Sequence, residues 1–377
     1  MTATTRVAIA GGGVAACALA IQLAREGLEV DMFDKADRVS ALGSGITLQG
    51  NALRAFGHLG VWEEVQAAGY AFNGLSLRAP GPGAPVVADM PEMSMGGPGF
   101  PAGMGMYRPD LARILTDGAI AAGARLHHSS EVTGCTTRED SVDVEVNGEI
   151  VGTYDLLVGA DGLHSRVREA IGIDLHPRRT GMGIWRAFVS RPAEVTHTEL
   201  YYGGPMYIAG YTPTGEDTMY AFLVEDAQEH VDVSDEEAVE IMRAQSMAYD
   251  GPWNHIRADL STASHVNYTW FTEHVIEGAW NRGRTVVIGD AAHSCPPTIA
   301  QGAAQALEDA EVLGELILRG DPIDQAFWDE FHERRVDRAT MVVRSSVQLG
   351  DWLLEGRRDA DVPGLVASVA QRVSVPA

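Results

Sequence analysis

Residues 6–35 read RVAIAGGGVAACALAIQLAREGLEVDMFDK, and this stretch determines the expected fold. The apolar run at 7–10 is typical of a strand buried on both faces of a parallel sheet. Three glycines follow directly, and residues 14–26 are rich in helix formers with apolar positions spaced for one buried face. Residues 30–33 supply a second strand, which Asp34 closes. The stretch therefore predicts a strand, a glycine turn, a helix and a second strand that ends in an acid.

Each part of this unit suits the binding of a dinucleotide. Gly11 permits the tight turn, and Gly13 lets the backbone approach a pyrophosphate. The start of the helix offers unpaired N–H groups and the positive end of the helix dipole to that anion. Asp34 stands where an acid accepts a hydrogen bond from the adenosine ribose. We therefore expect a dinucleotide site rather than a purely structural turn.

Composition limits the class of protein. A chain of 377 residues with 45% apolar residues can form two globular domains with substantial cores. No apolar run is long enough to span a bilayer and no signal peptide precedes the first strand, so we expect no integral membrane contact. Three cysteines provide no disulfide framework, which predicts a cytoplasmic location. The net charge of −24 argues against nucleic acid as a partner.

Two further apolar runs end in a pair of glycine and aspartate. Residues 156–158 precede Asp161 and Gly162, and residues 285–288 precede Gly289 and Asp290. Because ligands of open α/β sheets bind at the carboxyl ends of the strands, we expect all three turns at one sheet edge. A helix that starts near Gln301 can offer N–H groups to an anionic or carbonyl oxygen there.

The middle of the chain has a different pattern. Alternating segments at 185–189, 207–211 and 220–224 predict an antiparallel sheet in a second lobe, either as its aromatic core or as the cover of a cofactor site. Residues 79–105 are dominated by Gly and Pro and predict no regular element, but a surface excursion or, less favoured, a lid. A Gly-Ser-Gly turn at 43–45 either crosses a bound cofactor or is an ordinary connection.

No metal site is expected. His127 and His128 are adjacent, and His293 and Cys295 lack partners at the spacing of metal ligands. The motifs HExxH and CxxC are both missing from the sequence.

The motifs at the three strand ends are jointly specific. GGGVAA from residue 11, DGLHSRVR from 161 and GDAAHSCPP from 289, together with YRPDL from 107, resemble the single-component flavoprotein aromatic hydroxylases, the p-hydroxybenzoate hydroxylase-like family. The likeness is strongest to its salicylate- and urate-hydroxylase-like branches and extends from residue 6 to about 340. It implies an α/β fold, with a Rossmann-type FAD-binding domain around a parallel sheet, an antiparallel-sheet substrate domain and C-terminal helices.

The expected domains are discontinuous in sequence. The FAD-binding domain would comprise residues 1–70, 105–180 and 280–340. The substrate-binding domain would comprise 71–104 and 181–279, and residues 341–377 would form a helical tail.

The resemblance also implies which residues hold FAD. The first turn and Asp34 would bind its adenosine diphosphate half, Asp161 and Gly162 would serve both FAD and the nicotinamide coenzyme, and Asp290 would hold the ribityl chain. The loop 296–302 would lie along the flavin ring. The expected cofactor-binding set is Gly11, Gly13, Val14, Ala15, Asp34, Lys35, Arg108, Asp161, Gly162, Asp290, Pro297, Gln301, Gly302 and Ala303.

The loop after Pro296 departs from the family's pattern. The family commonly has Pro-x-Gly-x-x-Gly-x-Asn there, whereas Ile299, Ala300 and Ala304 stand near the glycine and asparagine positions of this chain. The departure affects the expected contacts to the pyrimidine edge of the flavin.

The activity that the resemblance implies is an FAD-dependent monooxygenation. NADH or NADPH would reduce the flavin, O2 would add to form a C4a-hydroperoxide, and one oxygen would pass to a small phenolic or heteroaromatic substrate. Such a site must exclude water and must polarise or deprotonate the phenol. The candidate catalytic residues are Tyr211, Tyr220, Arg186 and His293, although His293 is more simply explained as a support of its loop.

We expect the substrate between the flavin edge and the second-lobe sheet. Trp185, Tyr207, Tyr211, Tyr220 and Pro296 would line it. Because side chains alternate along a strand, Tyr207 and Tyr211 would share a face, but the sequence does not decide which face meets the substrate.

Two other functions are compatible with parts of the sequence. One is a non-oxygenating flavoprotein reductase or oxidase of the same fold, and the other is a nicotinamide-binding sensor without chemistry. The second and third turns argue against the sensor, because plain NAD binding does not need them. The sequence leaves open the identity of the aromatic substrate, the choice between NADH and NADPH, and whether the chain forms a homodimer.

Overall fold

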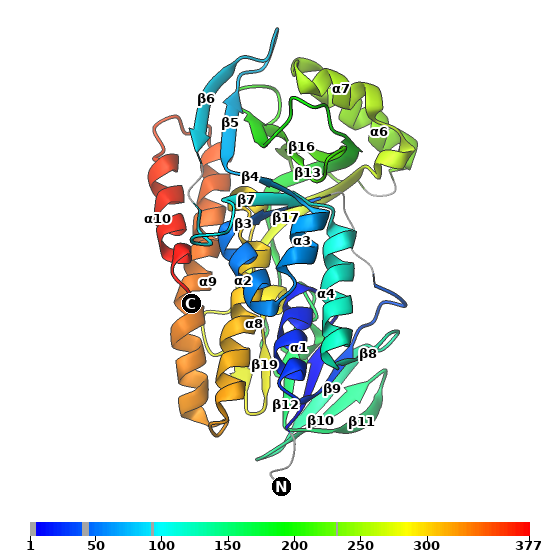
Figure 1. Cartoon of the computed structure of the whole chain (residues 1–377), viewed down its shortest axis with the longest axis vertical. Coiled ribbons are helices and arrows are strands. Elements are labelled where there is room, and N and C mark those ends of the chain that lie inside the picture. The colour runs from blue at the N-terminus through cyan, green and yellow to red at the C-terminus, as the bar shows by residue number, and fades with distance from the viewer. Residues whose placement is uncertain (1–4, 40–44, 92–93, 231–232) are drawn as a thin grey trace.

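The computed structural model describes residues 5–39, 45–91, 94–230 and 233–377 (Figure 1). Residues 43 and 44 of the expected Gly-Ser-Gly turn lie outside these ranges. Among the helices in these ranges, none is both long and apolar enough to cross a bilayer.

A six-stranded sheet forms the lower half of the molecule in Figure 1. Its strands pair in parallel except for β18, and their buried apolar side chains agree with the prediction of a parallel sheet covered on both faces. In spatial order the strands are β18 (Asn281–Arg282), β19 (Thr285–Val287), β12 (Leu156–Gly159), β1 (Arg6–Ala10), β2 (Glu29–Phe33) and β8 (Arg125–His127).

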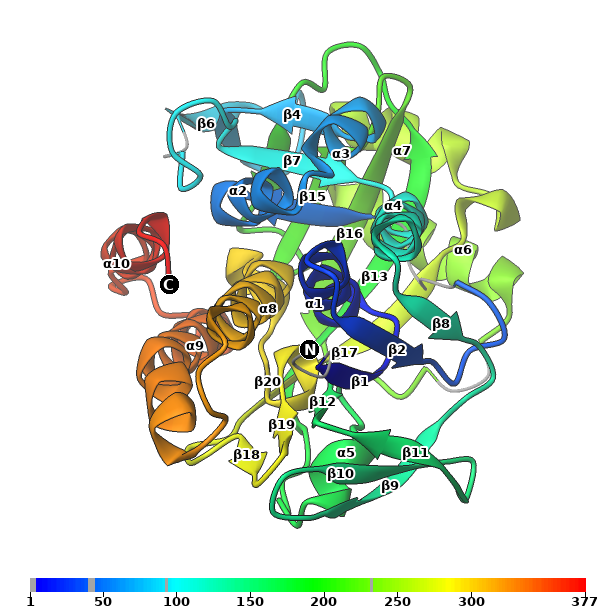
Figure 2. The same ribbon diagram turned by 60° about the horizontal axis from the view of Figure 1, so that its bottom comes forward.

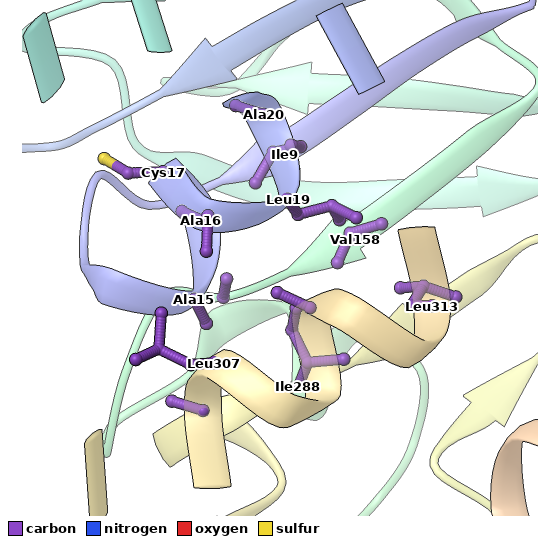
Figure 3. Close-up of a cluster of buried hydrophobic side chains, with 14 of the residues drawn as sticks. Ile9, Ala15, Ala16, Cys17, Leu19, Ala20, Val158, Ile288, Leu307 and Leu313 are labelled. Atoms are coloured by element: carbon purple, nitrogen blue, oxygen red, sulfur yellow. The ribbon is translucent and has the colours of Figure 1, made fainter. Parts of the chain in front are cut away.

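Helices cover one face of this sheet. Figure 3 shows the core there, in which Leu19 and Leu307 belong to two helices and Ile9 and Val158 to two neighbouring strands. Figure 2 shows a three-stranded sheet on the other side, made of β9 (Val132–Thr137), β10 (Val142–Val146) and β11 (Glu149–Tyr154). The helices of this half are α1 (Val14–Arg25), α2 (Gly50–Leu59), α3 (Trp62–Ala68), α4 (Arg108–Ala122), α5 (Arg166–Ala170), α8 (Gly302–Arg319) and α9 (Gln325–Leu354).

An eight-stranded sheet forms the other half, and it confirms the expected antiparallel lobe, with one parallel pair between β14 and β5. Helices α6 (Asp235–Gln245) and α7 (Pro252–Asp259) pack on its outer face. In spatial order its strands are β20 (His293–Ser294), β17 (Asn267–Val275), β13 (Arg178–Ser190), β16 (Thr218–Asp226), β15 (Ile208–Pro213), β14 (Thr198–Tyr201), β5 (Gly74–Arg78) and β6 (Val86–Pro91). Helix α10 (Val362–Ser374) lies beside α9.

The prediction of no regular element at 79–105 is wrong. Strand β6 pairs with β5, and β7 (Gly103–Met106) is the centre of a small sheet between β3 (Ile46–Gln49) and β4 (Tyr70–Phe72). Glycine occurs within β7 because a Cβ at Gly105 would lie 1.9 Å from the carbonyl oxygen of Pro213. The glycine therefore marks a close contact between two sheets, whereas the glycine-rich composition alone suggests a loop.

A buried carboxylate links the three strands β2, β8 and β11. Asp31 in β2 is 5% exposed and accepts hydrogen bonds from Arg125 of β8 (2.8 and 2.9 Å) and from Tyr154 of β11 (3.1 Å). The His127 ring lies 3.0 Å from the same carboxylate. Burial alone would raise the pKa of Asp31, but the hydrogen bonds from Arg125 and His127 and the arginine charge lower it to about 2.

This pKa gives a prediction for acid stability. Because the folded-state pKa is below the ordinary value of about 3.9, the contribution of Asp31 is present above that value and disappears as the pH falls towards 2. We expect Asp31→Asn to lower the free energy of unfolding by about 2 kcal/mol at pH 7. Urea unfolding at several pH values should show the difference from the parent shrinking below pH 4.

Asp37→Asn is the matched control, since the Asp37 side chain is 80% exposed. A gap between Asp31→Asn and the parent that stayed constant down to pH 2 would contradict this account.

Candidate active site

The three glycine turns lie along one edge of the parallel sheet, as predicted. Strands β1, β12 and β19 are neighbours and run in the same direction, so Gly11, Asp161 and Asp290 all follow their carboxyl ends. Backbone hydrogen bonds connect the ends of these strands, from Ala160 to Ala10 (2.8 Å) and from Ile288 to Gly159 (2.9 Å). This edge is where ligands of such sheets bind.

The first turn needs glycine for two different reasons. Gly11 has φ +105°, and a Cβ there would lie 2.3 Å from the carbonyl oxygen of Ala160. At Gly13, by contrast, a Cβ would meet no atom of the described chain within 4 Å. The start of α1 behind it has no side-chain cap from the described residues and no acid in its first turn. Open space beside unpaired N–H groups is what an anion requires.

A cavity of about 310 Å³ begins at this turn. It joins six of the predicted cofactor residues, Gly11, Gly13, Asp34, Lys35, Asp161 and Gly162. Ala15 is buried and Val14 partly buried at the start of α1, and neither is among the residues that line this cavity. The sequence reasoning missed other polar residues of the cavity wall, which come from the loops after β2, β8 and β12 and from the start of α5: Arg38, His128, Glu131, His164 and Arg166.

The Asp161 carboxylate, which lines this cavity, also makes hydrogen bonds within the protein. It accepts hydrogen bonds from the Ser165 hydroxyl (2.5 Å) and from the backbone N–H groups of Arg166 (2.7 Å) and Val167 (3.1 Å). Burial raises the pKa of Asp161, and these donors act in the opposite direction. The side chain therefore holds the start of α5 in place. Gly162 beside it has φ +82° and leaves its Cβ direction open in the described structure.

A buried aspartate holds the third turn. Asp309 of α8 accepts hydrogen bonds from the Gly289 N–H (2.8 Å), the His293 ring (2.7 Å) and Arg335 of α9 (2.7 Å). His293 is 3% exposed and Asp309 and Arg335 are fully buried. The catalytic role considered for His293 is therefore corrected, because its Nε2 is occupied by Asp309 and the ring supports the turn.

The same network continues to the flavin loop at the start of α8. Glu308 accepts hydrogen bonds from Arg335 (2.8 Å), Arg338 (2.7 and 2.9 Å) and Asn51 (3.0 Å). Asn51 and Gln301 exchange a pair of amide hydrogen bonds of 3.0 and 3.1 Å. The Gln301 side chain thus points into the protein, so any contact with a cofactor uses the backbone. Around it, Pro296 is buried, Pro297 is exposed and Gly302 and Ala303 are partly exposed.

Helix α8 begins without a side-chain cap from the described residues and without an acid in its first turn. A Cβ at Gly302 would meet no described atom within 4 Å. This second uncapped helix start lies at the same sheet edge as the first and can meet a partly negative oxygen.

The eight-stranded sheet presents two different faces. On β13 and β16 the side chains of Arg186, Phe188, Tyr220 and Phe222 share the inner face and keep part of their surface accessible. The residues that alternate with them along these strands, such as Ala187, point to the opposite face and are buried beneath α6 and α7. The inner face looks towards the parallel-sheet half, because the Phe188 ring lies 4.4 Å from that of Tyr107 and the Tyr220 hydroxyl lies 3.0 Å from that of Thr47.

This arrangement corrects two predicted substrate contacts. Trp185 and Tyr211 are 1% and 0% exposed and belong to the core under the outer face. The Tyr211 hydroxyl donates to Glu199, which Arg78 also binds, and burial together with Tyr201 and Glu199 raises the pKa of Tyr211. Neither side chain can face a flavin on the inner side, because strand alternation directs it away.

Tyr207 and Tyr211 do not share a face as expected. Tyr207 lies just before β15 and packs against a different apolar cluster, which includes Ile208 and Val224. Its hydroxyl donates to Asp226 (2.6 Å), and this hydrogen bond raises the pKa of Tyr207 to about 12. Tyr207 therefore packs against the same cluster as Leu200 and Phe222, while Tyr220 lies on the inner face within β16.

Charged groups converge between the two halves. Burial lowers the pKa of Arg186 to about 10, with an opposing effect of Tyr220 and a further lowering by Arg108. Arg186 donates to the Thr269 hydroxyl (2.7 Å), and no carboxylate of the described chain forms an ion pair with it. Burial raises the pKa of Asp290, which keeps accessible surface, while the His293 and Arg108 charges act in the opposite direction. Arg108 therefore lies near both Asp290 and Arg186.

Two inner-face residues were not predicted. Tyr202 keeps 38% of its surface accessible although surrounding protein raises the pKa of its hydroxyl to about 12. Leu200 is partly exposed and packs against the Ile208 and Val224 cluster. The signal that identifies such residues is partial exposure alternating with complete burial, which appears only once strand register is known.

Among the described residues, no group of three or more His, Cys, Asp or Glu is arranged to hold a metal ion.

Comparisons with known proteins agree with this geometry. Residues 4–346 match the family model described as the FAD binding domain. The aurachin C monooxygenase/isomerase of Stigmatella aurantiaca is 30% identical over 92% of this chain and 90% of that protein. The 3-hydroxybenzoate 6-hydroxylase of Klebsiella oxytoca is 27% identical over 93% of this chain and 89% of that protein.

Solved structures show the same fold. HpxO of Klebsiella pneumoniae, in a complex with FAD and uric acid, superposes with a TM-score of 0.84 at 19% identity, covering 100% of this chain and 98% of that one. The 2-methyl-3-hydroxypyridine-5-carboxylic acid oxygenase superposes with a TM-score of 0.79 at 24% identity, covering 98% of both chains. The chain belongs to the family of FAD-dependent aromatic monooxygenases.

The residues of this chain fit FAD. The open Cβ directions at Gly13 and Gly162 follow two neighbouring strands of one sheet edge, and those at Gly13 and Gly302 adjoin uncapped helix starts. A cofactor with a pyrophosphate in its middle and a ring at one end requires an extended edge of this kind.

This fit predicts that Gly13→Ala separates cofactor binding from folding. Gly13 has φ −82° and ψ −172°, which alanine adopts readily, so the apoprotein should keep its melting temperature. The added methyl group would occupy the space of the pyrophosphate, and we expect FAD binding to weaken at least tenfold, on the order of 1.4 kcal/mol. Flavin fluorescence titration of the apoprotein measures this change.

Gly11→Ala is the contrasting variant, since its Cβ meets the backbone of Ala160 and should destabilise the fold itself. Unchanged FAD affinity in Gly13→Ala would show that the pyrophosphate lies elsewhere.

Proposed function

We propose that this protein is an NADH- or NADPH-dependent FAD monooxygenase that hydroxylates a small phenolic or heteroaromatic substrate. The observation that carries the proposal is the pairing of two surfaces. One is the sheet edge where Gly13 and Gly162 leave open space beside the backbone, and the other is the partly accessible inner face of the eight-stranded sheet with Arg186 and Tyr220. Relatives named for 3-hydroxybenzoate and 3-amino-4-hydroxybenzoate support an aromatic substrate.

The cofactor supplies the oxygen chemistry. When bound and reduced by NADH or NADPH, FAD would supply, with O2, an electrophilic oxygen for transfer to an electron-rich ring. The protein binds and orients the cofactor through the backbone at the three turns and through Asp34 and Asp290. Apolar side chains of the inner face, Leu200 and Phe222 among them, exclude water from the reacting oxygen.

Arg186 and Tyr220 are the proposed substrate contacts. Arg186 lies among inner-face residues with only the Thr269 hydroxyl as a described hydrogen-bond partner, so most of its donors remain for a ligand. An arginine without a carboxylate partner favours an anionic oxygen, such as a phenolate or a ring carboxylate. The Tyr220 hydroxyl, held by Thr47, can exchange a hydrogen bond with the substrate hydroxyl.

Other features of the proposal are less specific. FAD is held without a covalent bond, because no Cys or His has a recognisable context for flavin linkage. O2 and the nicotinamide coenzyme are co-substrates, and the enzyme acts in the cytoplasm.

The experiment that tests this function is a turnover screen. The FAD-loaded protein is mixed with NADH or NADPH and a panel of phenols, and coenzyme oxidation, hydroxylated product and hydrogen peroxide are measured together. The proposal predicts a phenol that accelerates coenzyme oxidation and yields product with little peroxide. Rapid oxidation that gives only peroxide with every phenol would instead identify an oxidase.

The role of Arg186 gives a separate prediction. We expect Arg186→Gln to weaken binding of an anionic phenol such as a hydroxybenzoate by about tenfold to a hundredfold, since a hydrogen bond to a charged group contributes about 1.5–3 kcal/mol. Binding of the matching neutral carboxamide should change little. Perturbation of the flavin absorption spectrum on titration measures both affinities without turnover.

Arg178→Gln is the matched control, because Arg178 is exposed and pairs with Glu273 at the other end of β13. Equal losses for the acid and the carboxamide in Arg186→Gln would remove the proposed charge recognition.

A further inference from the structure

The loop 295–302 contains a backbone turn that its sequence does not favour. Ala300 has φ +52°, a left-handed conformation that costs an alanine roughly 1–2 kcal/mol. Such a conformation persists only when its surroundings determine it from several sides.

Two anchors flank the turn. On one side, Ile299 is partly buried and packs against an apolar cluster. On the other side, Gln301 is 1% exposed and is fixed by its paired amide hydrogen bonds with Asn51. The Thr298 hydroxyl adds a hydrogen bond of 2.8 Å to the backbone of Ser346 in α9.

Helix α10 provides most of the apolar cluster under Ile299. The cluster consists of Val369, Ala370 and Val373 of α10, Val342 of α9 and Met95, all at most 9% exposed. Figures 1 and 2 show α10 at the outer side of α9, away from the parallel sheet. A helix that packs mainly on α9 and α2 thus contributes to the cluster beneath the loop expected beside the flavin.

Buried arginines fix the carboxyl end of α10. Arg54 of α2 donates to the carbonyl oxygens of Ser374 (2.9 Å) and Met95 (2.9 Å). Arg338 of α9 donates to those of Arg372 (2.9 Å) and Val375 (2.7 Å). Positive charge at the last carbonyl groups of a helix is favourable because it meets the negative end of the helix dipole.

The second anchor of the loop belongs to the same network. Arg338 also binds Glu308, which accepts a hydrogen bond from Asn51, the partner of Gln301. Both flanks of Ala300 are therefore connected to α10, the first through the apolar cluster against which Ile299 packs and the second through a chain of hydrogen bonds.

From these contacts we infer that α10 is a positioning element for the flavin, acting through Ile299. Docking of α10 holds Ile299, and Ile299 holds the left-handed turn at Ala300 that sets the shape of the loop up to the uncapped start of α8. This inference rests on the FAD site described above but not on the proposed reaction. It assigns Ile299 and Val369 as positioning residues that need not touch the cofactor.

The test compares two substitutions on one helix. Val369→Asp places a charge in the cluster, whereas Val366→Asp places it on the same helix at a residue that is 41% exposed. The FAD dissociation constant of the apoprotein and the visible spectrum of the bound flavin are measured at a temperature where circular dichroism shows both variants folded. We expect Val369→Asp to weaken FAD binding by about tenfold and to shift the flavin spectrum, and Val366→Asp to leave both unchanged.

A double substitution identifies the route. If α10 acts through Ile299, Val369→Asp should reduce FAD affinity much less in the Ile299→Gly variant than in the parent protein, because the contact is already lost in that variant. Equal FAD affinity in Val369→Asp and Val366→Asp, or fully additive effects in the double variant, would overturn the inference. Should Val369→Asp fail to fold, Val369→Ala takes its place in the same comparison. No step requires turnover, so an incorrect reaction assignment cannot imitate either outcome.

Discussion

The Asp309 carboxylate is the constraint on which the candidate active site depends. It is fully buried and joins the turn after β19, the His293 ring and Arg335 of α9. Burial alone would raise the pKa of Asp309, but the His293 and Arg335 partners lower it, so the group stays ionised in the folded protein. A buried charge of this kind is tolerated only with such partners, and removing one of them costs about 3–5 kcal/mol. The Gly289–Asp290 turn is therefore fixed in one conformation.

The neighbouring Glu308 extends this constraint in both directions. It shares Arg335 with Asp309, binds Arg338 and receives a hydrogen bond from Asn51. Two carboxylates and two guanidinium groups balance each other, and all four residues are at most 2% exposed. One compact network thus sets the third turn, the flavin loop and the docking of α10. This network defines the local geometry more than it adds to the free energy of unfolding, since buried ion pairs contribute little net stability.

The two faces of the eight-stranded sheet differ in burial and in the polar groups that they carry. The outer face is a closed core beneath α6 and α7, and its polar groups, such as Glu199 and Tyr211, satisfy one another. The inner face carries Arg186 without an ion pair in the described structure and several partly accessible aromatic rings. The same strands therefore form a closed core on one side and present the proposed ligand contacts on the other.

Sequence reasoning predicted the parallel half of the fold well because its signals are local. The apolar run, the glycine triplet and Asp34 are contiguous, and short-range physics determines what they form. The face of the second sheet was not predictable, because Tyr211 and Tyr220 look alike until strand register places them on opposite sides. Asp309 and Arg335 were missed for a similar reason. They meet only after α8 and α9 pack, and neither belongs to a motif.

One residue type misled the sequence reasoning, and another had two explanations that only the structure separates. Glycines near 103–105 suggested a loop, but Gly105 is required by the approach of Pro213 between two sheets. His293 has the chemistry of a base, but its position at the end of the third turn makes it a partner of Asp309. In both cases a long-range contact gave the residue a structural purpose.

The central claim is that reduced flavin in this protein transfers oxygen to an aromatic substrate held against the inner face. Turnover under ¹⁸O2 with a substrate found by its stimulation of coenzyme oxidation, followed by mass spectrometry of the product, tests it directly. The account predicts one ¹⁸O atom in each molecule of hydroxylated product. Recovery of all the label as hydrogen peroxide or water, with the aromatic compound unchanged, would contradict it.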